Sequence, residues 1–132
     1  MAITKDNGRQ YPLTARVAFS GVTADAEVLA IDVYPAILLP AGAIVTGGYI
    51  AVKSVFTATT DFDVGDADPD RYTPTIVPGD VLGATKLVPD GVPYAVETWI
   101  NVSLVTSATI IGAGELVVEY IIEDRAQEVQ PL

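Results

Sequence analysis

The residues with the greatest capacity for chemistry in this sequence are the aspartates of the stretch TTDFDVGDADPDRY. Asp61, Asp63, Asp66, Asp68 and Asp70 fall within ten residues and are followed by Arg71 and Tyr72. Carboxylates at this spacing could hold Ca²⁺. Alternatively, two of them could serve as the general acid and base of a glycosidase-like site. A third interpretation is a polar turn without chemistry.

The calcium interpretation fails on the motif. An EF-hand loop needs acidic or amide ligands at positions 1, 3 and 5, Gly at 6 and Glu at 12. A loop that starts at Asp61 puts Gly65 at position 5 and Tyr72 at position 12, and one that starts at Asp66 puts Arg71 where Gly must bend the chain. A calcium site without this motif stays open as an alternative, because loops at strand ends with several carboxylates can bind Ca²⁺.

The composition of the stretch favours a structural turn. Pro69 fixes φ, and aspartate side chains can accept hydrogen bonds from nearby backbone N–H groups. A catalytic carboxylate pair would need one acid with a raised pKa in a cleft, and no aspartate is marked in that way by the sequence. We therefore predict a structural turn, with Arg71 offsetting the charge and Tyr72 beginning the next strand, formed by Asp66, Asp68, Asp70, Arg71 and Tyr72.

Composition excludes several classes of function. The chain has 132 residues, a formal net charge of −10 and only seven Lys and Arg residues, which argues against binding of nucleic acid or of an anionic membrane surface. It contains no His and no Cys, so it lacks imidazole bases, thiolate nucleophiles and the usual ligands of zinc. We predict no enzymatic activity, no metal and no cofactor.

One long apolar segment has the length of a membrane span. Residues 33–53, VYPAILLPAGAIVTGGYIAVK, carry no charge before the final Lys53. Pro35, Pro40 and the pair Gly47–Gly48 would break a helix repeatedly, so the motif PAG is expected to be a turn between two strands. The sequence predicts no membrane span here.

Elsewhere the apolar residues alternate with polar ones, as in half-buried antiparallel strands. Such runs cover residues 11–19, 27–33, 98–105 and 115–123. In the last of them Leu116, Val118, Tyr120 and Ile122 are expected to face the core, and Glu115, Glu119 and Glu123 to face solvent. About eight short strands with turns between them predict an all-β fold, either an antiparallel sandwich or a small barrel.

The segment 43–56 is apolar on both of its faces. Ile44, Ile50, Val52 and Phe56 are expected on one face, and Val45, Tyr49, Ala51 and Val55 on the other. A strand of this kind lies in the centre of a sandwich or has one face covered by a partner, and Gly47–Gly48 predicts a bulge or a bend. The whole chain, 1–132, is expected to form one domain with arms at residues 2–10 and 124–132.

Four stretches together resemble a known family. The start MAITKDNGRQYPLTARVAF, then LPAGAIVTGGYIAV, FDVGDADPDRY and the final ELVVEYIIEDRA are similar to the capsid cement or decoration proteins of tailed bacteriophages. The resemblance covers residues 2 to about 126 and consists of strands and turns, without a chemical signature. It implies a jelly-roll-like β-sandwich of about eight strands and a non-enzymatic role in stabilising the phage head.

The resemblance implies a location and partners. The protein would be made in the host cytoplasm and would sit on the capsid exterior of the virion, bound to the major capsid protein. We expect a homo-oligomer, trimer or dimer, because the chain offers more apolar surface than a small sandwich buries. The candidate interface residues are Trp99, Tyr49, Val45 and Val55. The alternatives are a structural component of the tail or baseplate and a jelly-roll carbohydrate-binding module.

Overall fold

The alternating pattern of the sequence folds into eight β-strands in a computed structural model that describes residues 11–21, 32–56, 61–75, 77–105 and 112–123. The strands are β1 (Leu13–Gly21), β2 (Asp32–Leu39), β3 (Ala43–Ser54), β4 (Asp61–Gly65), β5 (Val77–Pro78), β6 (Gly83–Lys86), β7 (Thr98–Val105) and β8 (Gly112–Ile122). In these described ranges, no helix is long and apolar enough to cross a membrane. The two predicted arms, 2–10 and 124–132, and most of the predicted strand 27–33 lie outside them.

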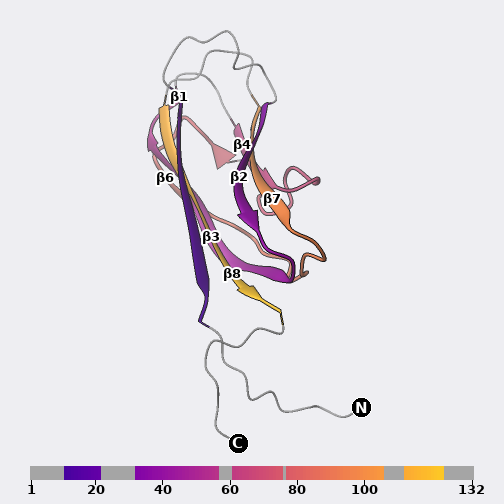
Figure 1. The fold of residues 1–132 in the computed structure, drawn as a ribbon. Coiled ribbons are helices and arrows are strands. Elements are labelled where there is room, and N and C mark those ends of the chain that lie inside the picture. The colour runs from indigo at the N-terminus through magenta and orange to yellow at the C-terminus, as the bar shows by residue number, and fades with distance from the viewer. Residues whose placement is uncertain (1–10, 22–31, 57–60, 76, 106–111, 124–132) are drawn as a thin grey trace, which may run out of the picture.

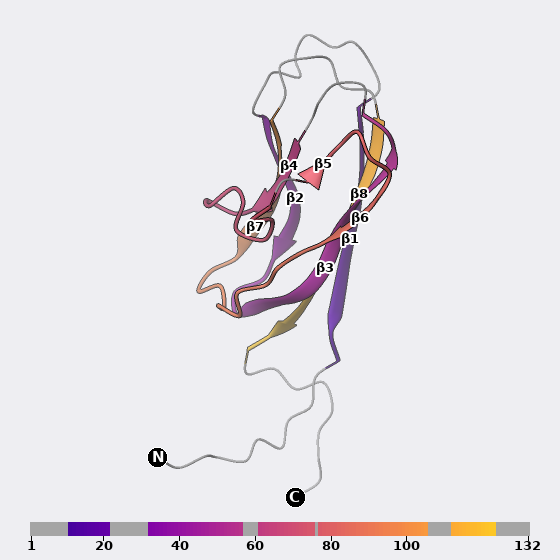
Figure 2. The ribbon, with the colours of Figure 1, turned by 180° about the vertical axis from the view of Figure 1, so that it is seen from behind.

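The strands form two four-stranded sheets that pack face to face (Figure 1; Figure 2). One sheet has the order β1-β8-β3-β6 and the other has the order β2-β7-β4-β5, and every ladder is antiparallel. The first strand therefore pairs with the last, the second with the seventh, the third with the sixth and the fourth with the fifth. This nested pairing is the jelly-roll arrangement. The predicted antiparallel β-sandwich is confirmed, and the small barrel is not what forms.

The apolar segment 33–53 forms two strands that meet at the PAG motif, as predicted, and the two strands belong to different sheets. β2 ends at Leu39, and the turn that follows is closed by the N–H of Ala43, which donates to the carbonyl oxygen of Pro40 at 3.2 Å. Gly42 adopts a φ of 83° in this turn, a conformation that costs glycine little and other residues more. β3 then enters the opposite sheet between β8 and β6.

A bulge in β3 inverts the pattern of its side chains. The register against β8 shifts between Val45 and Gly47, so that Val45 faces the core before the bulge and Ile50 faces it afterwards. The bulge at Gly47–Gly48 is thus confirmed. The predicted faces are wrong in one respect, because Val45 shares the core with Ile50 while Ile44 is on the opposite side. One extra residue reverses the two-residue alternation beyond it.

Three phenylalanines occupy the space between the sheets at one end of the core. Phe56 and Phe62 meet edge to face with ring centroids 4.9 Å apart, and Phe19 lies 5.6 Å from Phe62. The glycines at the start of β8 make room for these rings, because a Cβ atom on Gly112 or Gly114 would lie 2.6 Å from a phenylalanine carbon. The first three residues of β8, Gly-Ala-Gly at 112–114, therefore serve the packing of this strand against the aromatic rings.

Candidate functional site

The aspartate stretch begins on β4 and turns sharply at its end. Phe62 and Val64 are buried in the core, and the chain reverses directly after Gly65. A Cβ atom on Gly65 would lie 2.1 Å from the carbonyl oxygen of Asp68, so the turn closes against the strand end too tightly for any side chain there. The N–H of Tyr72 donates to the carbonyl oxygen of Val64 at 2.9 Å. Tyr72 thus belongs to the turn, and the expectation that it begins a strand is wrong, since β5 starts at Val77.

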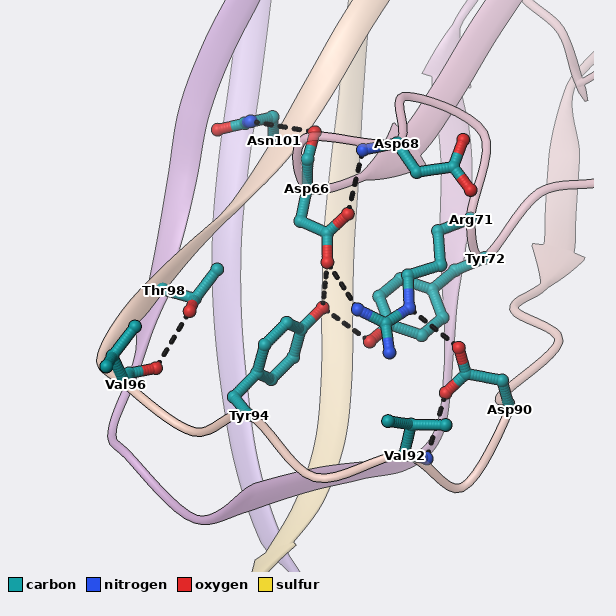
Figure 3. Close-up of polar contacts among 10 residues, drawn as sticks. All are labelled: Asp66, Asp68, Arg71, Tyr72, Asp90, Val92, Tyr94, Val96, Thr98 and Asn101. Atoms are coloured by element: carbon teal, nitrogen blue, oxygen red, sulfur yellow. Dashed lines mark hydrogen bonds and ion pairs between the residues drawn. The ribbon is translucent and has the colours of Figure 1, made fainter.

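The carboxylate of Asp66 is the centre of the turn's hydrogen bonding (Figure 3). The N–H of Asp68 donates to its Oδ1 at 2.9 Å, the hydroxyl of Tyr94 donates to its Oδ2 at 2.8 Å, and Arg71 forms an ion pair with the same oxygen. Arg71 also donates from Nε to Asp90 at 2.7 Å. Its guanidinium therefore joins two carboxylates, and only 17% of its side chain is exposed.

Two tyrosines enclose the same guanidinium. The carbon Cζ of Arg71 lies 4.8 Å from the ring centroid of Tyr94 and 5.4 Å from that of Tyr72, distances at which cations are attracted to aromatic faces. The two tyrosine hydroxyls are 2.6 Å apart. The N–H of Tyr94 also donates to the carbonyl oxygen of Ala43 at 2.9 Å. The cluster therefore ties the aspartate turn to segment 87–97 and to the start of β3.

Sequence reasoning found one half of this cluster and missed the other. Arg71 and Asp66 lie in the quoted aspartate stretch, whereas Asp90 and Tyr94 follow it by some twenty residues. No spacing rule relates the two segments, because the pairing β3–β6 and the turn after β4 bring them together only in the folded chain. Near Asp90 the sequence offers the Pro-Asp-Gly run of residues 89–91, which indicates only a change of direction.

The electrostatics of the cluster hold its carboxylates in the charged form. Burial raises the pKa of Asp66, but the hydrogen bonds from Asp68, Arg71 and Tyr94 outweigh it, so that the pKa of Asp66 lies below the usual value. The hydrogen bond from Arg71 likewise lowers the pKa of Asp90. A carboxylate that is ionised and fully engaged in this way does not act as a general acid. Within the described ranges, no group of three or more acidic side chains is arranged to hold a metal ion.

We expect acid to weaken the fold through this cluster. A carboxyl whose pKa is lowered by folding stabilises the native state above its unfolded pKa of about 4, and this contribution disappears as the pH falls through the lower, folded pKa. The free energy of unfolding should therefore decrease below about pH 4. Urea titrations between about pH 6 and 2 measure it. The variant Arg71→Ala is the control, and an equally steep decrease in that variant would contradict the assignment.

The four candidate interface residues do not form one surface. Val45 is buried in the core with 2% of its surface exposed. Trp99 is exposed on β7, whereas Tyr49 and Val55 are exposed on or beside β3, in the other sheet. Tyr49 is in addition engaged, because its hydroxyl donates to Glu115 at 3.2 Å. Trp99 and the pair Tyr49 and Val55 thus lie in two separate exposed areas, and their part in binding a partner stays a prediction.

Glu115 differs from its sequence-based description. It lies on the outer face of its sheet, as predicted, but only 2% of its surface is exposed. Lys53 donates to its carboxylate at 2.7 Å and Arg16 forms an ion pair with it, so that side chains from β1 and β3 cover β8. The hydrogen bond from Lys53, together with that from Arg16, lowers the pKa of Glu115. The alternation of apolar and polar residues predicted the correct face for Glu115 but the wrong exposure. It carries no information about side chains of the neighbouring strands, which cover this residue.

Large apolar side chains are exposed at several other places. They lie on β2, beside β6 and in the segment after it, and comprise Val33, Tyr34, Leu38, Val81, Leu82, Val88, Val92 and Val96. Single exposed apolar residues are ordinary, but grouped ones mark surfaces that bind a partner. The chain therefore carries several candidate binding surfaces, and its polar cluster serves the fold.

The sequence matches no protein-family model and no curated protein. The fold is similar to that of a chain in the acidic stable capsid structure of Helicobacter pylori bacteriophage KHP30, with a TM-score of 0.63 and 17% identity, over 93% of this chain and 96% of that chain. For the capsid asymmetric unit of cyanophage Pam1 the TM-score is 0.55 at 22% identity, over 92% and 91%. For the capsid of Ralstonia phage GP4 it is 0.54 at 14% identity, over 95% and 92%. At these identities the likeness shows the fold, a β-sandwich shared with chains of phage capsid structures.

Proposed function

We propose that this protein is a non-enzymatic structural component of a phage particle that binds the outer surface of the capsid and stabilises the head by joining neighbouring major capsid subunits. The observation that carries the proposal is the likeness of fold to chains from three phage capsid structures. These similarities cover at least 92% of this chain and at least 91% of each of the others, so they concern whole chains rather than one shared hairpin.

The physical character of the molecule supports the same role. A protein that reinforces a shell needs a stable sandwich and exposed surface for its partner, and it needs no reacting groups. The aromatic core and the cluster around Arg71 stabilise the sandwich, and the exposed apolar side chains offer surface to a partner. A net charge of −10 suits a place on the outside of the shell better than contact with packaged nucleic acid.

The proposal includes self-association as a trimer or dimer. Val81 and Leu82 are exposed beside β6, and Val88 and Val92 follow on the same segment of chain, so this edge of the molecule offers apolar surface to a second copy. The segments 2–10 and 124–132 are proposed as arms that reach a neighbouring subunit. Sedimentation of the free protein at high concentration tests the self-association. A protein that stays monomeric at every concentration would contradict it.

The test of the main proposal uses preformed shells of the major capsid protein from the same phage. We expect the purified protein to co-sediment with the shells at a fixed ratio and to raise their melting temperature, because a ligand that binds only the assembled state stabilises it. A heat-unfolded sample of the same protein is the control. Shells that melt at the same temperature with and without the protein would contradict the cementing role. Gold labelling at the tail of intact particles would instead favour a tail or baseplate component.

A further inference from the structure

The two sheets of this protein differ sharply in charge. The outer face of the sheet β2-β7-β4-β5 carries Asp61 and Asp63 of β4, and no strand of this sheet contains Lys or Arg. The strands of the sheet β1-β8-β3-β6 contain three basic residues against two acidic ones, and two of the three, Arg16 and Lys53, are paired with Glu115. The strands of the sheet β2-β7-β4-β5 thus present the more negative of the two outer faces.

The aspartate turn adds to this negative side. It projects outward from β4 on the side away from the other sheet (Figure 1; Figure 2), and Asn101 of β7 donates to the carbonyl oxygen of Asp66 at 3.5 Å. Asp68 and Asp70 are exposed on it. Burial raises the pKa of Asp63, and the nearby charges of Asp70 and Asp61 raise it further. The carboxylates of strand and turn are therefore close enough to repel one another.

An apolar stripe lies beside the acidic one on the same outer face. Leu38 of β2 and Trp99 of β7 are directly opposite each other in the ladder and are 41% and 48% exposed. Val33 and Pro35 continue the stripe along β2, since they lie opposite Ser103 and Asn101 on the same face. The bulge after Pro35 brings Leu38 onto this face as well. Val33 and Asp63 lie in register on either side of Ser103 of β7, about two strand spacings or roughly 10 Å apart. Leu38 and Trp99 lie further along these strands, beyond the level of Gly65, where the aspartate turn begins.

A second copy of this chain is a poor occupant for this face. Two such faces in contact would place acidic side chains against each other or bury them against apolar side chains, and both arrangements are unfavourable. A partner with an apolar side chain flanked by Lys or Arg satisfies both stripes at once. The aromatic Trp99, at the apolar end, is the residue type most often found at the energetic centre of protein interfaces.

We propose that the outer face of β2, β7 and β4 is the surface that binds the capsid, with an apolar side chain of the major capsid protein seated on Trp99 and Leu38 and with its basic side chains facing Asp61, Asp63 and the aspartate turn. This assignment rests on the proposed function. It leaves the edge beside β6 for self-association and the Glu115 side of the sandwich exposed to solvent.

The experiment compares charge-matched variants in the shell-binding assay. The double substitution Asp61→Asn/Asp63→Asn removes two charges from the proposed face. The matched substitution Glu119→Gln/Glu123→Gln removes two exposed charges from the other sheet, one in β8 and one directly after it. We expect the first variant to bind about three- to tenfold more weakly at low salt, with the difference shrinking at about 0.5 M salt, and the second to bind like the wild type. Melting temperatures of the free variants verify that both are folded.

A second pair of variants probes the apolar stripe. Trp99→Ser should weaken binding by about 30-fold, as for a central aromatic residue, while Trp99→Phe should retain most of the affinity. Wild-type protein that does not bind shells would refute the proposed function itself. If the wild type binds, two results overturn the assignment of the face. One is unchanged shell binding by both Trp99→Ser and Asp61→Asn/Asp63→Asn. The other is weaker shell binding by Glu119→Gln/Glu123→Gln. It is also overturned if Trp99→Ser changes the sedimentation of the free protein, which would indicate a second copy on this face.

Discussion

Replacing Gly48 with alanine is expected to destabilise the protein by about 3–5 kcal/mol, a large part of the stability of a small domain. Gly48 adopts a φ of 124° in the bulge of β3, and a Cβ atom there would lie 2.0 Å from the carbonyl oxygen of Val117 on β8. The substitution therefore adds backbone strain of about 1–3 kcal/mol to a clash with rigid main chain of similar cost. Urea unfolding measures the change.

Gly83 provides the matched control for this prediction. Its φ is 133°, close to that of Gly48, but a Cβ atom there would have no neighbour within 4 Å. Gly83→Ala should therefore report the backbone strain alone, about 1–3 kcal/mol. The difference between the two variants isolates the clash with β8, and equal destabilisation by both would show that the bulge does not approach that strand so closely.

Arg71→Ala is expected to cost about 2–4 kcal/mol, because it leaves two carboxylates without their shared cation and removes the group between two tyrosine rings. The sequence alone indicates a partly exposed contact, for which the loss of the arginine would lower the free energy of unfolding by only about 0.5–1.5 kcal/mol. The side chains of Arg71 and Asp66 are largely covered, and a charge left alone there is hydrated poorly. Thermal and urea unfolding at pH 7 measure the loss.

Arg16→Ala is the comparison for an exposed cation. Arg16 also pairs with a covered carboxylate, that of Glu115, but 64% of its own side chain is exposed and Lys53 remains to share the charge. Its loss should therefore destabilise the protein much less than the loss of Arg71. A loss as large as that of Arg71→Ala would mean that the burial of the guanidinium is not what makes Arg71 important.

The sequence determined the long strands β1, β3, β7 and β8 and several of the turns, whereas the short strands β5 and β6 carried no clear pattern. Alternation of apolar and polar residues identifies a strand without reference to its neighbours, and the turns at Pro40–Gly42 and after Gly65 depend on residues a few positions apart. The bulge at Gly47–Gly48 was visible for the same reason. Local chemistry also indicated a polar turn after β4, because neither calcium frame fitted the ligands of an EF-hand loop.

Exposure, and hence the candidate surfaces, depended on strands distant in the chain. Val45 became core because the bulge reversed the faces of β3, and Glu115 was covered because β1 and β3 lie on either side of β8. Alternation predicts which face of the sheet a residue lies on. Which side chains cover that face depends on the order of the strands in the sheet.

The partners of Arg71 and the more negative outer face of one sheet have the same origin. Asp90 and Tyr94 reach Arg71 through the jelly-roll pairing, and Asp63 comes to lie across β7 from Val33 through strand order alone. The sequence therefore determined the long strands and the local turns between them, which depend on neighbouring residues. The tertiary structure decided which surfaces exist, because a surface is made by side chains that the sequence keeps apart.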